Sequence, residues 1–443
     1  MTSIVPSPYL PNTDADRRAM MREIGVGSIE ELFQDIPDKL RHAQFNLPSP
    51  LSELELKKEL GQLANRNVSL DNCACFLGAG SYRHFIPGTV EHVISRSEFY
   101  TAYTPYQAEV SQGTLQGTYE YQSLACQLTG MEVSNAGMYD GSTAAAEAAI
   151  MACMITKRGK VAVASTVNPT YRDVIRTYVK ARNFSMETVE LDSSLSSDCA
   201  CLVAQQPNFF GYLEEMEAHV QKAHDIGALF IAIVDPISLG MFRPPGHYRA
   251  DIAVADAQAL GNPTGFGGPG LGVFTCRQEY LRQMPGRIVG KTVDVEGKPG
   301  YVMTLVTREQ YIRRERATSN ICTSEALMAL AGAVYLATLG KRGLRQVAEL
   351  CYHKAHYAAE KIAKLKGYSL VFPKPFFKEF AIRCPRAPSQ INQALLKKGI
   401  IGGLDISHTI ENGMLLCVTE MTTRQEIDKL VETLGTFQGA RHE

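Results

Sequence analysis

The sequence predicts an α/β protein with a large domain built on a mostly parallel sheet, a smaller C-terminal α+β domain and a helical N-terminal arm. Between residues 73 and 325, short apolar runs alternate with amphipathic segments of helical length. Strands that alternate with helices in this way favour a parallel sheet covered on both faces. A chain of 443 residues is also too long for one simple core, so several domains are expected.

The arm, residues 1–72, is polar and is expected to pack on something else, such as another subunit. Its helical segments carry apolar residues at helical spacing, and Pro37 and the segment 47–50 separate them. The predicted helices are 14–24, 28–33 and 53–64.

The large domain, residues 73–325, contains the alternating elements. Its predicted helices are 114–128, 142–156, 169–182 and 213–225, and its predicted strands are 160–165, 187–191, 199–204, 229–235, 250–256 and 271–276. A long apolar helix over 324–339 closes this domain or opens the next.

The small domain, residues 326–443, is predicted from a second mixture of elements. The expected helices lie near 341–365, 388–398 and 424–434, and the expected strands lie near 368–372, 378–383 and 414–418.

Composition excludes several classes of function. A net charge of −1 gives no reason to expect nucleic acid or an anionic membrane as a partner. No apolar stretch approaches the length of a membrane helix, and the N-terminus lacks the features of a signal peptide. The 11 cysteines form an odd number and lie in apolar segments, which favours reduced thiols and a cytoplasmic location. Neither their spacing nor that of the histidines matches a metal site, so no metal is expected.

Two consecutive predicted strands and the turn after them indicate a cofactor fold. The apolar run 229–234 ends in Asp235, and the strand 250–256 leads into the glycine-rich turn 261–272. Many pyridoxal phosphate (PLP) enzymes pair such an Asp with the pyridinium nitrogen and attach the cofactor to a lysine that follows the second strand. The large-then-small domain order is also typical of the aspartate aminotransferase-type, PLP-dependent transferase fold. An Asp that caps the turn at Pro236, and a turn that is only a tight connection, remain alternatives.

The lysine that such an enzyme requires is missing. No lysine occurs between Lys222 and Lys291, and residues 258–261 are Gln, Ala, Leu and Gly. None of these side chains forms an imine. The sequence therefore predicts a PLP-type scaffold without its covalent anchor.

The segment 99–116 combines tyrosines, amides and a carboxylate without an amphipathic period. Tyr103 and Tyr106 flank Pro105 on a stretch expected to be extended, where they can present rings and hydroxyls to a flat polar cofactor. A packing loop whose hydroxyls cap nearby backbone is the alternative.

Asp140 and the residues after it lead into a predicted helix. The N–H groups at this start and the hydroxyls of Ser142 and Thr143 can hold a phosphate, and PLP folds place their phosphate cup before the first sheet helix. The same residues serve equally as an ordinary N-cap. The arginine cluster, Arg308, Arg313, Arg314 and Arg316, suits either an anion site or a solvated, ion-paired surface.

Together these segments resemble the glycine cleavage system P-protein family, specifically the N-terminal subunit of its two-subunit form. The resemblance rests on segments 76–88, 103–113, 139–148, 234–240, 266–272 and 318–323, which occur in family order over essentially the whole chain.

The resemblance implies a subunit of glycine decarboxylase in which a second, catalytic subunit supplies the Schiff-base lysine and carries PLP. The implied complex is a heterotetramer that decarboxylates glycine, releases CO2 and passes the aminomethyl group to the lipoamide of H-protein. Aminomethyltransferase and dihydrolipoamide dehydrogenase are the expected functional associates. Carried onto this sequence, the resemblance makes Tyr103 and Tyr106 the residues that reach the partner's PLP site, and leaves Ser142, Thr143 and Asp235 as vestiges. The expected supporting residues are Gln107, Glu109, Ser111 and Gln112.

Two alternatives remain open at this stage. One is a structural or regulatory pseudoenzyme that makes no contribution to the active site. The other is a self-sufficient PLP enzyme that uses a lysine from elsewhere, for example Lys291.

Overall fold

The computed structural model describes residues 9–41, 46–265 and 267–437. The chain divides into two compact units, Met1–Val68 and Ser69–Glu443, which are described separately. Phe266 of the glycine-rich turn lies outside the described residues. So do residues 1–8, on which the prediction about a signal peptide depends. Among the described helices, none is long and apolar enough to cross a membrane.

The described part of the N-terminal unit has helices at the three predicted places and a short helix, α2 (Asp38–Arg41), that was not predicted. Thr13 and Ser52 each begin a helix with a capping box, in which their side chains exchange hydrogen bonds with Asp16 and Glu55. These helices contain no buried residue, so their apolar side chains face solvent. The helices are α1 (Asp14–Ile24), the 3-10 helix η1 (Ile29–Phe33), α2 (Asp38–Arg41) and α3 (Glu53–Ala64).

In the described part of the second unit, seven strands form one sheet in the order β2-β8-β7-β6-β5-β3-β4. The strands from β7 to β4 are parallel, β8 pairs antiparallel with β7, and the short β2 pairs antiparallel with β8, which confirms the mostly parallel sheet. The central strands read as continuous apolar runs because both faces are covered. The strands are β2 (Val133–Ser134), β3 (Lys160–Ala164), β4 (Ser185–Val189), β5 (Cys199–Gln206), β6 (Leu229–Val234), β7 (Ile252–Asp256) and β8 (Gly272–Cys276).

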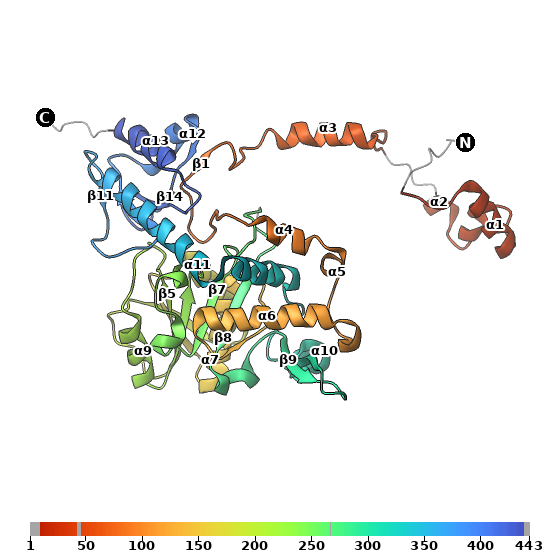
Figure 1. Ribbon diagram of the computed structural model, residues 1–443, viewed down its shortest axis with the longest axis horizontal. Coiled ribbons are helices and arrows are strands. Elements are labelled where there is room, and N and C mark those ends of the chain that lie inside the picture. Colours follow the sequence, from red (N-terminus) through yellow and green to blue (C-terminus); the bar gives the residue numbers. More distant parts are fainter. Residues whose placement is uncertain (1–8, 42–45, 266, 438–443) are drawn as a thin grey trace. The chain divides into compact units, whose positions relative to one another are not determined.

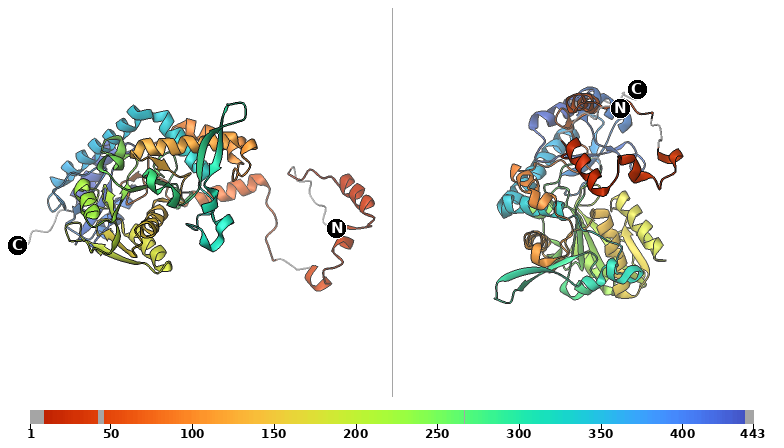
Figure 2. Two further views of the ribbon diagram at one scale, coloured as in Figure 1. Left: turned by 90° about the horizontal axis from the view of Figure 1, so that it is seen from below. Right: turned by 90° about the vertical axis from the view of Figure 1, so that its right-hand side faces the viewer.

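Helices lie along both faces of this sheet (Figures 1 and 2). The alanine-rich helix α7 packs directly on the strands, because its small side chains allow a close approach, and most of its residues are buried. Helix α8 packs on α7, and α6 packs beside α11. These helices are α6 (Gln112–Thr129), α7 (Gly141–Thr156), α8 (Pro169–Ala181) and α9 (Met216–Asp225). Helix α9 begins three residues after the predicted start at residue 213.

Helix α11 (Ala326–Ala363) contains a break at Gly340, whose φ of 58° and ψ of −176° are not helical. The sequence predicts two helices here, and the break divides α11 where they were expected to separate. The first half and the beginning of the second, as far as Cys351, contribute buried residues to the core of the large sheet, and the rest of the second half contributes to a C-terminal core. The three-part division at 72/73 and 325/326 stays a prediction.

The C-terminal core surrounds an antiparallel sheet of four described strands, in the order β11-β12-β15-β14. Ala74 and Phe76 belong to the same core, because β1 (Ala74–Cys75) pairs in parallel with β13 (Ile400–Ile401). The remaining elements here are β11 (Ser369–Leu370), β12 (Glu379–Arg383), β14 (Leu404–Asp405), β15 (Gly413–Cys417), α12 (Pro388–Lys397) and α13 (Arg424–Gly435).

Several elements are absent from the sequence analysis. The largest is an antiparallel hairpin of β9 (Ile288–Val293) and β10 (Pro299–Thr304), which projects from the large sheet domain (Figure 2). The short helices are α4 (Gly88–Ile94), α5 (Ser97–Tyr100) and α10 (Gln310–Arg313), and the 3-10 helix η2 (Ala108–Val110) precedes α6.

Candidate cofactor pocket and tyrosine loop

A pocket lies at the carboxyl ends of β6 and β7, the edge where α/β sheets commonly bind ligands. Asp235 directly follows β6, and Asp256 is the last residue of β7. The pocket, called the Asp235 pocket here, contains a cavity of about 40 Å³. Its lining includes Gly80, Tyr82, Asn168, Tyr171, Gln205, Asp235, Asp256, Phe377, Lys378 and Glu379.

A lysine that the sequence analysis did not single out occupies this pocket. The Lys378 ammonium lies 2.6 Å from Asp235 Oδ2, and both side chains are buried. Burial is the largest influence and lowers the pKa of Lys378, but the carboxylate of Asp235 and the nearby Cys417 and Cys351 together oppose it, so that the pKa lies above its ordinary value. Asp235 Oδ1 accepts hydrogen bonds from the backbone N–H groups of Ile237 and Ser238. Both carboxylate oxygens are therefore engaged within the chain.

The start of α7, where a phosphate cup was considered, is also engaged. Asp140 is the N-cap: its Oδ1 accepts from Ser142 Oγ at 2.6 Å and from the Thr143 N–H at 2.8 Å. The Thr143 hydroxyl lies against the Asp140 backbone. Gly141 donates its N–H to Asp256 Oδ2 at 3.1 Å. Burial raises the pKa of Asp256 to about 6.

Gln258, the first residue of the stretch 258–261 in which the Schiff-base lysine is missing, has structural partners. Gln258 accepts the N–H of Tyr82 at 2.9 Å and donates to the carbonyl of Asn262 at 2.7 Å. Lys291 is exposed on β9, in a two-stranded sheet separate from the large one, and does not line the pocket. A pyridinium at Asp235 would require the position that Lys378 holds, so the residues of this pocket do not fit PLP.

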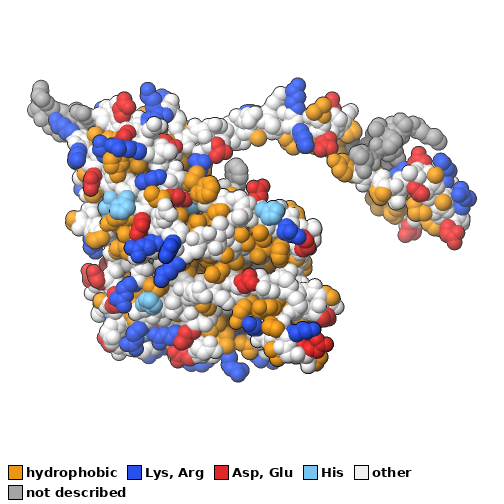
Figure 3. Space-filling model, in the orientation of Figure 1, with side chains coloured by type: hydrophobic (Ala, Val, Ile, Leu, Met, Phe, Trp, Pro, Cys, Tyr) orange, Lys and Arg blue, Asp and Glu red, His pale blue; other side chains and the backbone are white. Residues whose placement is uncertain are grey.

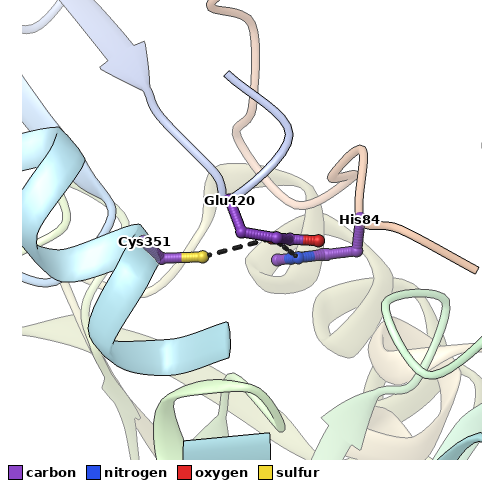
Figure 4. Close-up of side chains that lie close together, drawn as sticks. All are labelled: His84, Cys351 and Glu420. Carbon is purple, nitrogen blue, oxygen red and sulfur yellow. Dashed lines mark hydrogen bonds and ion pairs between the residues drawn. The ribbon is translucent and has the colours of Figure 1, made fainter. Parts of the chain in front are cut away.

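A chain of buried hydrogen bonds extends from the pocket to His84, Glu420 and Cys351 (Figure 4). Lys378 Nζ lies 3.1 Å from His84 Nε2, and an ammonium only donates, so Nε2 accepts and the proton is on Nδ1. His84 Nδ1 then donates to Glu420 Oε2 at 2.7 Å. The Cys351 thiol donates to the same oxygen at 3.4 Å, and burial raises its pKa. A protonated Nδ1 and a protonated thiol are poor metal ligands, so we assign this cluster as a hydrogen-bonded structural element.

The tyrosine loop, defined as residues 101–111, connects α5 to α6 and does not line the Asp235 pocket. Tyr103 and Tyr106 are 74% and 54% exposed, so neither is a core residue. Buried Arg287 holds the loop in place: it donates to Thr104 Oγ1 at 3.1 Å, to Tyr106 Oη at 3.4 Å and to the Cys322 carbonyl at 2.7 Å. Arg287 could not be recognised from the sequence, because it lies far from the loop along the chain and within no recognisable motif.

The expected supporting residues of the loop have different positions. Gln112 joins the start of α6 to the hairpin through two hydrogen bonds with the backbone of Tyr301, at 2.9 and 2.8 Å. Gln107 and Glu109 are exposed, and Ser111 is half-buried just before α6. Among these four residues, the structure assigns a structural contact between elements to Gln112.

The arginine cluster separates into two kinds of residue. Arg308 donates to the backbone carbonyls of Met284, Gly286 and Leu305, and therefore holds loops together. The other three, Arg313, Arg314 and Arg316, are exposed.

Comparisons with known proteins identify the family of this chain. The family model described as "Glycine cleavage system P-protein" matches residues 7–434. The chain is 53% identical to the probable glycine dehydrogenase (decarboxylating) subunit 1 of Thermomicrobium roseum, over 96% of this chain and 98% of that protein. It is 49% identical to the protein of that name from Desulforamulus reducens, over 97% and 99%.

Solved structures agree. A crystal structure of glycine decarboxylase (P-protein) of the glycine cleavage system, in inhibitor-bound form, superimposes with a TM-score of 0.92 at 42% identity, over 97% of this chain and 100% of that one. A Burkholderia pseudomallei sphingosine-1-phosphate lyase has a TM-score of 0.64 at 14% identity, over 90% and 93%, and shows a shared fold. The predicted α/β, PLP-dependent transferase-like fold class is confirmed. The chain belongs to the glycine cleavage system P-protein family.

Proposed function

We propose that this chain is subunit 1 of a two-subunit glycine dehydrogenase (decarboxylating), and that it completes an active site whose PLP belongs to the partner subunit. The family membership and the names of its full-length relatives support the reaction: decarboxylation of glycine with release of CO2. Transfer of the aminomethyl group to the lipoamide of H-protein belongs to the same proposal. The associations with aminomethyltransferase and dihydrolipoamide dehydrogenase, and the cytoplasmic location, stay predictions.

The observation that carries the proposal is the Lys378–Asp235 ion pair. It occupies the position at which this chain would bind the cofactor ring, and Gln258 begins the stretch 258–261, which lacks an imine-forming lysine. A chain of this family that cannot hold the cofactor contributes to the reaction through surfaces that it presents to another subunit. We therefore assign PLP to the partner.

The tyrosine loop suits such a contribution. Around its two tyrosines, further apolar side chains reach the surface, and in Figure 3 hydrophobic side chains gather on the face that carries α4 and α6. Exposed apolar groups in this number mark a surface that binds another protein. These residues and their exposed fractions are Tyr100 (68%), Val110 (76%), Tyr311 (53%) and Ile312 (47%).

We assign Tyr103 and Tyr106 as the residues that enter the partner's site, with their hydroxyls available to donate hydrogen bonds. Gln107, Glu109, Ser111 and Gln112 are the supporting residues of the tyrosine loop, and Gln112 anchors the end of the loop to the hairpin. Arg287 is a positioning residue, because it acts on the reaction through Tyr106 and Thr104.

The test is glycine–CO2 exchange by the reconstituted complex, with Tyr103→Phe and Tyr106→Phe compared with Tyr100→Phe. Tyr100 is the matched control because it is an exposed tyrosine on the same surface, in the adjoining helix α5, and is not assigned to the partner's site. We expect the first two changes to lower the exchange rate at least tenfold, while co-purification with the partner is unchanged, since only a hydroxyl is lost. If both variants keep the turnover and the glycine affinity of the unmodified complex, the chain is a structural or regulatory pseudoenzyme and the proposal is wrong.

A further inference from the structure

Lys378 is unusual because its ammonium group is fully buried, and because residues of the same chain satisfy all of its hydrogen-bonding capacity. An ammonium carries three N–H donors. One points to Asp235 Oδ2 at 2.6 Å and one to His84 Nε2 at 3.1 Å. The ring of Tyr82 lies with its centroid 3.6 Å from Nζ, within the range of a cation–π contact. The ammonium therefore has three partners for its three donors.

These partners come from distant parts of the chain. Lys378 immediately precedes β12, Asp235 follows β6, and Tyr82 and His84 belong to the segment that follows β1. Burying an ion pair this deeply has a large desolvation penalty unless every charged group keeps a partner. Removing one partner should therefore destabilise the burial of the others. The arrangement connects the C-terminal core to the pocket edge of the large sheet.

The start of α7, beside the lining residues Tyr171 and Asp256, is closed as well. The space beside Gly141, at the N-terminus of α7, is so tight that a methyl group there would lie 2.2 Å from Tyr171 Oη and 2.7 Å from the backbone nitrogen of Asp256. The carboxylate of Asp256 accepts the Gly141 N–H that would otherwise face an anion. A phosphate would meet the carboxylates of Asp140 and Asp256 at this point.

We propose that this chain fills its own cofactor pocket: the Lys378 ammonium replaces a pyridinium at Asp235, and the Asp256 carboxylate replaces a phosphate at the start of α7. The fold is then complete without a ligand. This inference concerns the chain's own pocket and does not depend on the reaction proposed above. It implies that shortening Lys378 creates a binding site for a small primary alkylammonium ion, with Asp235 as its counter-ion.

The test uses chemical rescue of Lys378→Ala. Alanine retains Cβ, so the missing atoms correspond to propylammonium. We expect the variant to lose about 5–10 °C in Tm, because one member of a buried ion pair remains alone. Millimolar propylammonium should raise the Tm of the variant in a saturable manner, while tetramethylammonium, which has no N–H donor, should not.

The matched control is Lys374→Ala. Lys374 is an exposed lysine in the same segment, and it lies over the ring of Tyr212 at 4.9 Å. Lys374→Ala should change the Tm by no more than about 2 °C, because an exposed cation–π contact contributes little. Propylammonium should leave the Tm of this variant unchanged. An unchanged Tm in Lys378→Ala, or the same response to propylammonium in both variants and in the unmodified chain, would overturn the proposal.

A second comparison covers the case in which Lys378→Ala does not fold. Methionine is close in shape to lysine and has no charge, so Lys378→Met leaves Asp235 unpaired, whereas Lys378→Met with Asp235→Asn removes both charges. If Lys378 balances Asp235, the double variant should unfold at a higher urea concentration than Lys378→Met alone. Strictly additive losses would show that the two groups are not coupled and would contradict the inference.

Discussion

Tyr82 donates its hydroxyl proton to Glu379 Oε2 over 2.7 Å, at the edge of the pocket that Lys378 fills. Glu379 Oε1 accepts the N–H of Ala79 at 2.6 Å, so the buried carboxylate has a partner on each oxygen. Burial nevertheless raises the pKa of Glu379 to about 6, and the two hydrogen bonds oppose this shift only in part.

The raised pKa gives a direction for the effect of pH on stability. Between the unfolded pKa, near 4.5, and the folded pKa, about 6, the folded state binds more protons than the unfolded state, so stability falls as pH rises. Glu379→Gln keeps an acceptor for Ala79 and can donate to Tyr82 Oη. We expect the variant to be more stable than the parent by about 2 kcal/mol at pH 7.5 and to show little difference at pH 4.5. Urea unfolding at both pH values measures this, and equal midpoints at pH 7.5 would show that Glu379 is not strained by burial.

Arg287→Ala should loosen the tyrosine loop without unfolding the sheet. The loop loses its hydrogen bonds at Thr104 and Tyr106, and the cation–π contact at 5.6 Å from the Tyr106 ring. We expect faster chymotrypsin cleavage after Tyr103 and Tyr106 in the isolated chain, and a lower kcat with a nearly unchanged KM in the complex. Exposed Arg282→Ala is the control. Protection from chymotrypsin equal to that of the control would mean that the loop is held in another way.

Gly340 tests the break in α11. Its positive φ lies in a region of backbone conformation that is essentially restricted to glycine, and a Cβ there would meet no atom within 4 Å. Gly340→Ala should therefore destabilise the chain through the backbone alone, by about 1–3 kcal/mol.

Gly113 provides the comparison for that change. It lies in the first turn of α6 with open space at its Cβ position, so Gly113→Ala should be neutral or slightly stabilising. Urea unfolding of the two variants should give shifts of different size or sign. A Gly340→Ala chain as stable as Gly113→Ala would show that α11 can run straight through.

The strands and helices of the large sheet could be predicted because each depends on local apolar patterning. The strand predicted at 229–235 and the helix predicted at 142–156 correspond closely to β6 and α7, and even the division of α11 at Gly340 follows from the sequence. The β9–β10 hairpin was missed because its strands are largely exposed and lack an apolar run.

The Asp235 pocket could be predicted only in part. Asp235 was recognisable because it ends a buried strand, and the missing lysine at 258–261 was recognisable by its absence. Lys378 was not, since its partner His84 lies 294 residues away in sequence, and a lysine before a short strand normally faces solvent. Arg287 escaped notice for the same reason. Contacts between distant segments depend on the fold, and neither residue belongs to a local motif.

The most direct test of the division of labour is borohydride reduction of each subunit incubated with PLP, followed by peptide mapping and glycine–CO2 exchange on the same preparations. We predict that the partner subunit retains PLP on a specific lysine, that neither Lys378 nor Lys291 of this chain is specifically labelled, and that exchange requires both chains. Specific trapping of PLP on Lys378 or Lys291, together with glycine–CO2 exchange by this chain alone, would contradict the account.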